Sequence, residues 1–191
     1  PPRYQREVIR SALTLKLHCF EDTGAIVAAV TTSLPEAPGA ERNWDYRYCW
    51  LRDAYYVVDA FRLLGHFEER EAFVAFVLNA VITHPDLDLG PVYDVTGSAN
   101  LPERIEKHWA GFNGDGPVRV GNAAADQTQH DVFGELVLTL APVFHDERFR
   151  AERTSATLEF VLKLADRAIE VAGTPDRGIW EWRADPKHFT S

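Results

Sequence analysis

Apolar positions recur with helical spacing over most of the chain. Between residues 4 and 20 they fall on one side of a helix. Residues 52–64 are apolar around nearly the whole circumference, which predicts a helix that is buried on all sides and ends at Gly65. The pattern over 68–83 is amphipathic, and the acidic residues in its first turn suit the helix dipole.

A long irregular segment separates these helices from the next ones. Residues 84–121 are rich in Gly and Pro, and a loop of this length inside a compact domain usually has a function. We expect one short helix within it, over Glu103–Trp109, and longer helices over about 123–140 and 154–172. Because no segment alternates like a strand, the pattern predicts an all-α fold of five substantial helices in two layers.

Composition and charge narrow the possible partners. The chain has 191 residues, of which 46% are apolar, and its net charge of −9 argues against non-specific nucleic-acid binding. No apolar run approaches the roughly 18 residues of a membrane span, and no secretory signal is visible. Cys19 and Cys49 lack metal or disulfide spacing, so we expect buried free thiols and a cytoplasmic protein. The absence of methionine and the abrupt end at Ser191 suggest a piece of a longer protein.

The densest polar and aromatic cluster runs from Arg42 to Asp53. It holds two Trp, two Tyr, three Arg and two Asp. Aromatic rings stack on the apolar faces of sugars, while Arg52 can donate from a fixed fork and Asp53 can accept from two hydroxyls. These residue types are typical of a sugar site. Alternatively, Asp53 caps the following helix and Arg52 pairs with it structurally.

A second cluster, Gly178–Arg183, places Glu181 between Trp180 and Trp182. Two flanking indoles would partly desolvate the carboxyl group, which favours its protonated form and suits a general acid. Alternatively, Glu181 is a surface residue between two tryptophans that serve packing.

The third cluster, residues 121–131, combines small residues with several side-chain amides. It can line a ligand, or it can simply begin a helix with small packing residues. His130 beside Asp131 resembles part of a catalytic dyad, but no nucleophile motif accompanies it. No zinc or phosphate-binding motif is present, so we expect neither a metal nor an organic cofactor.

Three segments occur in an order that resembles bacterial glycoside hydrolases of the glucoamylase/trehalase type, glycoside hydrolase family fifteen. They are Ser33–Glu36 with Arg42–Ala54, then Pro117–Ala124, then Gly178–Glu181. The resemblance implies an (α/α)6 barrel, a six-hairpin toroid. Residues 1–191 would form roughly its first half, the N-terminal part of the catalytic domain, without the C-terminal half.

The resemblance also implies inverting hydrolysis of α-glucosidic bonds without a cofactor. Glu181 matches the general acid, and Arg52 with Asp53 matches the pair that grips the terminal glucose. The remaining residues implied to bind substrate are Tyr46, Trp50 and Trp180 around the sugar and Asn122 in a substrate-lining segment.

The general base of the family lies well downstream of the acid, so we expect it outside this chain and expect the chain alone to be inactive. A half barrel would expose apolar flanks, so the chain should self-associate or pair with a missing half. Exo-acting, glucoamylase-like hydrolysis of α-glucans or oligosaccharides is the leading hypothesis, with trehalase as the alternative. A non-catalytic carbohydrate-binding or interaction module and a helical scaffold without a ligand are hypotheses of other classes.

Overall fold

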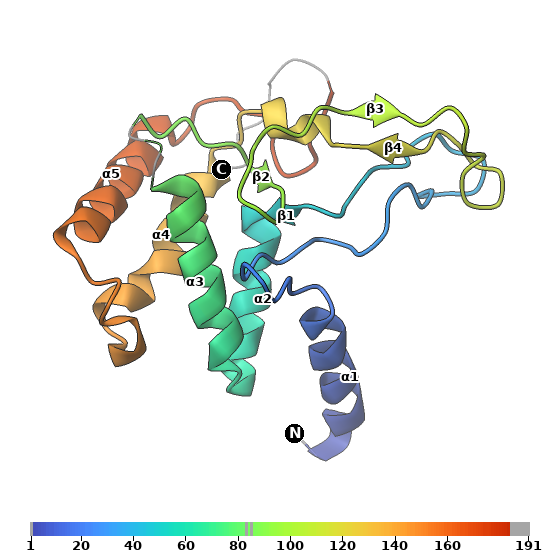
Figure 1. Cartoon of the computed structure of the whole chain (residues 1–191). Helices are drawn as coiled ribbons and strands as arrows, with labels where there is room; N and C mark the ends of the chain where they lie inside the picture. The colour runs from blue at the N-terminus through green and yellow to red at the C-terminus, as the bar shows by residue number, and fades with distance from the viewer. Residues whose placement is uncertain (1, 83, 85, 184–191) are drawn as a thin grey trace.

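The computed structural model describes residues 2–82, 84 and 86–183, and its fold is mostly helical, as expected (Figure 1). The α-helices in this part of the chain are α1 (Gln5–Lys16), α2 (Leu51–Leu64), α3 (Phe67–Val81), α4 (Asp131–Leu140) and α5 (Ser155–Val171). Shorter 3-10 segments are η1 (Pro2–Tyr4), η2 (Ala123–Asp126), η3 (Ala141–Phe144) and η4 (Glu147–Phe149). The strands, two residues each, are β1 (Cys49–Trp50), β2 (Val92–Tyr93), β3 (Arg104–Ile105) and β4 (Arg119–Val120).

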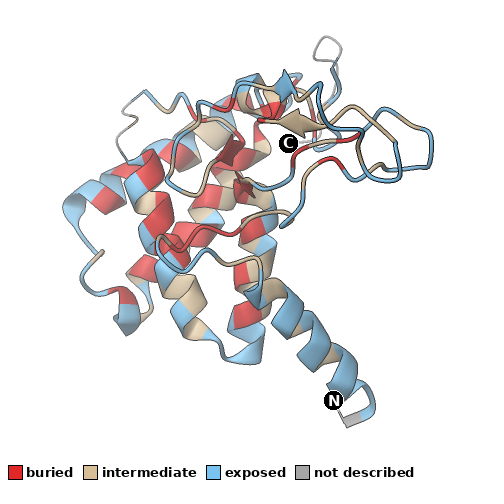
Figure 2. Ribbon diagram, turned by 45° about the vertical axis from the view of Figure 1, so that its right-hand side comes forward, coloured by how far each residue is buried: buried red, intermediate tan, exposed pale blue. Residues whose placement is uncertain are grey.

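Helices α2 to α5 build the core. Helix α2 packs against both α3 and α4, and α5 packs against α4 (Figure 1). The buried residues of Figure 2 line the surfaces where these helices meet. They include Ala54 and Val58 of α2, Phe73 and Val77 of α3, Leu136 and Leu140 of α4, and Phe160 and Leu164 of α5.

The strands and long loops gather at one end of the helices (Figure 1). Strand β1 pairs antiparallel with β2, so that Cys49 lies opposite Tyr93 and Trp50 opposite Val92. Strand β3 pairs antiparallel with β4. Because α2 begins directly after β1, this pairing fixes its first turn at the end of the molecule where the loops meet.

Helices α1 and α2 are less buried than their apolar patterns suggest, and the prediction that residues 52–64 are buried on all sides is wrong. Helix α1 has the predicted apolar stripe, but none of its residues is buried, and Leu13 is 56% exposed. Helix α2 is buried only on the side that faces α3 and α4, while Tyr56 and Leu63 are 65% and 71% exposed. Periodicity reports which positions are apolar, and burial additionally requires an element that covers them.

Two predicted helices also differ in extent. Residues 123–140 form η2 and α4 with a break between them. The backbone is extended at Gln127, and the side chains of Gln127 and Gln129 bind the loop that holds Glu181. The short helix expected over Glu103–Trp109 is replaced by β3, which pairs with the strand that follows the loop. The helices expected over 68–83 and 154–172 are confirmed as α3 and α5, with residue 83 outside the described residues.

Gly65 ends α2 as predicted, with a left-handed φ of 82°. Both cysteines are free thiols, Cys49 fully buried and Cys19 only partly. Within the described ranges, no helix combines the length and apolarity needed to cross a membrane.

Candidate active site

A cavity of about 810 Å³ opens among the loops at the β1 end of α2. Its wall comes from the segment leading into α2, from residues around η2 and from the loop that follows α5. All seven residues singled out in the sequence line it: Tyr46, Trp50, Arg52, Asp53, Asn122, Trp180 and Glu181. The three sequence clusters therefore meet in one place.

Glu181 lies at the centre of the polar contacts in this cavity. Its Oε1 accepts a hydrogen bond from Trp50 Nε1 at 2.6 Å and another from Gln129 Nε2 at 3.1 Å. Arg52 Nη2 forms an ion pair with the same oxygen at 3.6 Å. The side chain is 20% exposed, so the carboxyl group is held firmly but remains accessible from the cavity.

The two indoles beside Glu181 in sequence do not enclose its carboxyl group. Trp180 and Trp182 are 72% and 48% exposed. Glu181 has a φ of 53° and donates its backbone N–H to Gly178 O, so a tight turn separates its side chain from its neighbours. Both flanking indoles are thus largely exposed, and the indole that donates a hydrogen bond to the carboxyl group belongs to Trp50.

Arg52 lies in the first turn of α2 and links several acidic groups. Its side chain is only 18% exposed, and Nη1 lies 2.9 Å from Gln129 Oε1 and 3.1 Å from Asp131 Oδ2. Nε lies 3.6 Å from Asp53 Oδ2. The expected ion pair between Arg52 and Asp53 is therefore present, but it is only one of several contacts that the Arg52 guanidinium group makes.

Asp53 offers its carboxylate to the cavity. Asp53 lies in the first turn of α2, and the N-cap residue of this helix, Trp50, makes no side-chain capping hydrogen bond. The side chain is 49% exposed and lines the cavity wall. Partial burial raises its pKa, and the neighbouring Arg52 opposes this effect.

Glu135 is a site-adjacent carboxyl group to which the sequence assigned no role. It lies one helical turn after Asp131 on α4, on the side that faces Arg52 and Asp53. Burial, with the negative charge of Asp131 as a second cause, raises the pKa of Glu135 to about 8. The i, i+4 spacing of the two acids is the sequence signal for this pair.

Tyr46 and Asn122 occupy different kinds of position in the wall. The Tyr46 ring lies 5.8 Å from the Trp50 ring, and burial raises the pKa of its hydroxyl. Asn122 is 3% exposed, and both ends of its amide bind the loop: Nδ2 donates to Asp45 O, and Oδ1 accepts from Ala124 N. The side chain of Asn122 thus supports the wall from behind, in line with the packing alternative for this cluster.

Asp176 holds the loop of Glu181 against the start of α4; the sequence predicts a turn at this residue but not this contact. Its carboxylate is 1% exposed and accepts from the backbone N–H groups of His130 and Gly178, both at 2.9 Å. Gln127 adds a hydrogen bond from Nε2 to Glu181 O at 3.3 Å. An Asp two residues before Gly178, directly after a Pro, was a signal for such a turn.

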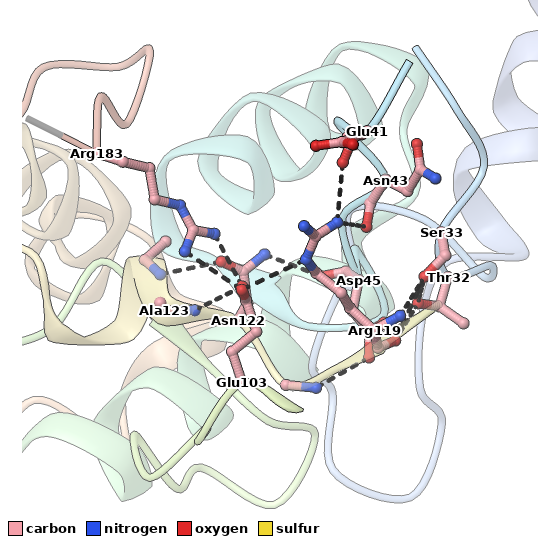
Figure 3. A network of polar contacts seen from close by, with 12 residues as sticks. Thr32, Ser33, Glu41, Asn43, Asp45, Glu103, Arg119, Asn122, Ala123 and Arg183 are labelled. Carbon is pink, nitrogen blue, oxygen red and sulfur yellow. Dashed lines mark hydrogen bonds and ion pairs between the residues drawn. The ribbon is translucent and has the colours of Figure 1, made fainter. Parts of the chain in front are cut away.

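A polar network lies beside the cavity, and its members Arg119 and Arg183 line the cavity (Figure 3). Glu103 pairs with Arg183 at 2.8 Å and with Arg119 at 3.5 Å. Both guanidinium groups lie over the Trp44 ring, at 4.6 Å for Arg119 and 4.3 Å for Arg183. These contacts tie together three loops that are distant in sequence, next to residues that line the cavity.

The part of the chain that the structure describes holds no group of three or more His, Cys, Asp or Glu placed to bind a metal ion. The polar groups around the cavity are instead carboxylates, amides and guanidinium groups, which can donate to and accept from hydroxyl groups. A carboxyl group gripped from one side and open to a cavity can also transfer a proton.

The chain is similar to several trehalases. It is 41% identical over 187 residues to "Trehalase" of Mycolicibacterium smegmatis and 42% identical over 188 residues to "Trehalase" of Mycobacterium tuberculosis, covering 95% of this chain and 27% of each relative. It is 37% identical over 186 residues to "Trehalase" of Thermoplasma acidophilum, covering 97% of this chain and 31% of that protein. The chain thus spans about a third or less of the length of these relatives. The comparison with solved structures gave no significant match.

Residues 2–191 match the family described as "Glycosyl hydrolases family 15". The match includes all three clusters that meet in the cavity, in agreement with the resemblance seen in their motifs. The chain therefore belongs to glycosyl hydrolase family 15.

Proposed function

We propose that the intact protein carrying this chain hydrolyses α-glucosidic bonds with inversion, and that residues 1–191 supply its general acid and its glucose-gripping residues. The observation that carries the proposal is the Glu181 carboxyl group. Trp50 and Gln129 hold it in a cavity that Arg52 and Asp53 also line. A proton donor beside paired hydroxyl-binding groups is what cleavage of a terminal glucose requires.

The proposed reaction uses two carboxyl groups. Glu181 gives its proton to the glycosidic oxygen as the bond from C1 to that oxygen breaks and the leaving sugar departs as an alcohol. A second carboxylate takes a proton from the water that attacks C1 from the opposite face, and about 6.5–9.5 Å between the two groups leaves room for this water. We assign this base to a part of the intact protein outside these 191 residues, so the chain alone should release no glucose.

The other residues bind the sugar in this proposal. Arg52 and Asp53 hold the hydroxyl groups of the terminal glucose, where bidentate, charge-assisted hydrogen bonds give both strength and direction. Tyr46 and Trp50 form an apolar wall, and the exposed Trp180 ring offers a second face. Asn122 acts through the backbone that it supports.

Trehalose and longer α-glucans are the two candidate substrates. Glucoamylase-like, exo-acting cleavage fits the terminal-glucose site, and the names of the similar proteins favour trehalose. The test is glucose release by the intact protein from trehalose, maltose, isomaltose and starch, with the first product anomer followed by NMR. Initial β-glucose from any of them supports the proposal. Binding without glucose release from all of them would favour a carbohydrate-binding module.

We further propose that residues 1–191 form the N-terminal part of an (α/α)6 barrel whose remainder covers their exposed apolar faces. Ile9 and Leu13 of α1 and Tyr56 of α2 are each more than half exposed, and exposed apolar side chains on packed helices are typical of a surface that a partner covers. By sedimentation, the purified chain should self-associate or bind the remaining part of the protein. A stable monomer that does neither would contradict this.

A further inference from the structure

The three groups that contact the Glu181 carboxyl group all reach one oxygen. Trp50 Nε1, Gln129 Nε2 and Arg52 Nη2 lie 2.6, 3.1 and 3.6 Å from Oε1. Among the described residues, none of the hydrogen bonds and ion pairs of Glu181 involves Oε2. An oxygen surrounded by N–H donors is an acceptor, so the proton of the acid form belongs on Oε2.

The orientation of the Gln129 amide follows from its neighbours. Its side chain is 1% exposed, and its Oε1 accepts from Arg52 Nη1 at 2.9 Å. A guanidinium group can only donate and an ionised carboxylate can only accept. Exchanging the amide nitrogen and oxygen of Gln129 would therefore place two donors against each other at Arg52 and two acceptors against each other at Glu181. The second hydrogen of Nε2 points to Gln127 Oε1 at 3.3 Å, so this buried amide is fully used.

We propose that Gln129 is a positioning residue that holds Glu181 by Oε1 and thereby directs the proton on Oε2 toward the leaving oxygen. This inference rests on the proposed function. As the proton moves from Oε2 and the bond between C1 and the glycosidic oxygen breaks, negative charge develops on the carboxyl group. The donors already aimed at Oε1 stabilise that charge without rearranging.

Two substitutions in the intact protein separate this role from simple packing. Gln129→Glu keeps an acceptor toward Arg52 and replaces the amide donor to Glu181 by a second carboxyl group, whereas Gln129→Met removes both at similar size. Thr128→Val, at the exposed neighbouring position, is the matched control. Each variant is assayed on the disaccharide that the intact protein cleaves and on α-glucosyl fluoride, whose fluoride leaves with little help from an acid.

A positioning role predicts a loss that depends on the leaving group. We expect kcat on the disaccharide to fall roughly 10- to 100-fold in both Gln129 variants, while kcat on the fluoride stays within about threefold. Equal losses on the two substrates, or no loss on either, would overturn the inference. Gln129→Glu is nearly isosteric and carries the test if Gln129→Met does not fold.

Glu181→Gln, measured beside these variants, separates this inference from the proposed function. If Glu181→Gln loses disaccharide cleavage and the Gln129 variants do not, only the role of Gln129 is wrong. If Glu181→Gln retains full turnover, the proposed function itself is wrong.

Discussion

Replacing Glu135 by Gln tests the electrostatics of the acidic groups beside the cavity. The pKa of Glu135 is raised from 4.5 to about 8, first by burial and then by Asp131, with Asp53 adding and Arg52 opposing. The native state therefore holds a proton that the unfolded chain releases above about pH 4.5. The stabilisation from this proton is complete below pH 4.5 and is lost as the pH rises through about 8.

The size of the effect follows from the shift. A change from 4.5 to about 8 corresponds to at most about 5 kcal/mol of unfolding free energy, since one pKa unit is worth about 1.4 kcal/mol. Glu135 is only partly buried, and solvent screening lowers our expectation to about 2 kcal/mol. Gln is uncharged at every pH, as the protonated acid is. The Glu135→Gln variant should therefore keep its unfolding free energy at alkaline pH, where wild type loses about 2 kcal/mol.

The assay is urea unfolding of the 191-residue chain at pH 5, 7 and 9, followed by circular dichroism. Wild type and Glu135→Gln should agree within about 0.5 kcal/mol at pH 5, and Glu135→Gln should be more stable by about 2 kcal/mol at pH 9. Glu68→Gln, an exposed position on α3, should follow wild type throughout. A constant difference between wild type and Glu135→Gln across this range would refute the reasoning.

Two further substitutions test the scaffold and the site. Gly121→Ala should cost about 2–4 kcal/mol in urea unfolding, because a Cβ would lie 2.1 Å from Pro102 O at a φ of +85°. Gly114→Ala, at a φ of +84° with open space around it, should cost only about 1 kcal/mol, and equal losses would argue against the close approach. Trp50→Phe removes the donor to Glu181 but keeps a ring, so turnover of the intact protein should fall roughly 10-fold or more, and Tm should also fall because Trp50 is 2% exposed and packs in a hydrophobic cluster. Unchanged turnover would show that this hydrogen bond does not matter.

The location of the site could be predicted from sequence, whereas the contacts within it could not. Trp50, Arg52 and Glu181 belong to segments rich in groups that bind sugars, and the structure brings them to one cavity. The contact between Trp50 and Glu181 spans 131 positions, and no local pattern predicts it. Local pattern instead favoured the indole of Trp180, which the tight turn at Glu181 directs elsewhere.

The break between η2 and α4 shows that long-range contacts, which local sequence patterns do not predict, also change the backbone. Helical periodicity continues through Gln127 and Gln129, but Asp176 binds the backbone N–H of His130 from 46 positions away. The side chains of the two glutamines then reach Glu181. A tertiary contact therefore overrides local helix propensity at the point where side chains are needed by the site.

The central claim is that Glu181 is the proton donor of an α-glucosidic hydrolase. Its most direct test is Glu181→Gln in the intact protein, with glucose release measured on trehalose and maltose and sugar binding measured by calorimetry. The account predicts that kcat falls at least about 100-fold, while the affinity for glucose stays within about threefold of wild type. Wild-type turnover by Glu181→Gln would contradict it.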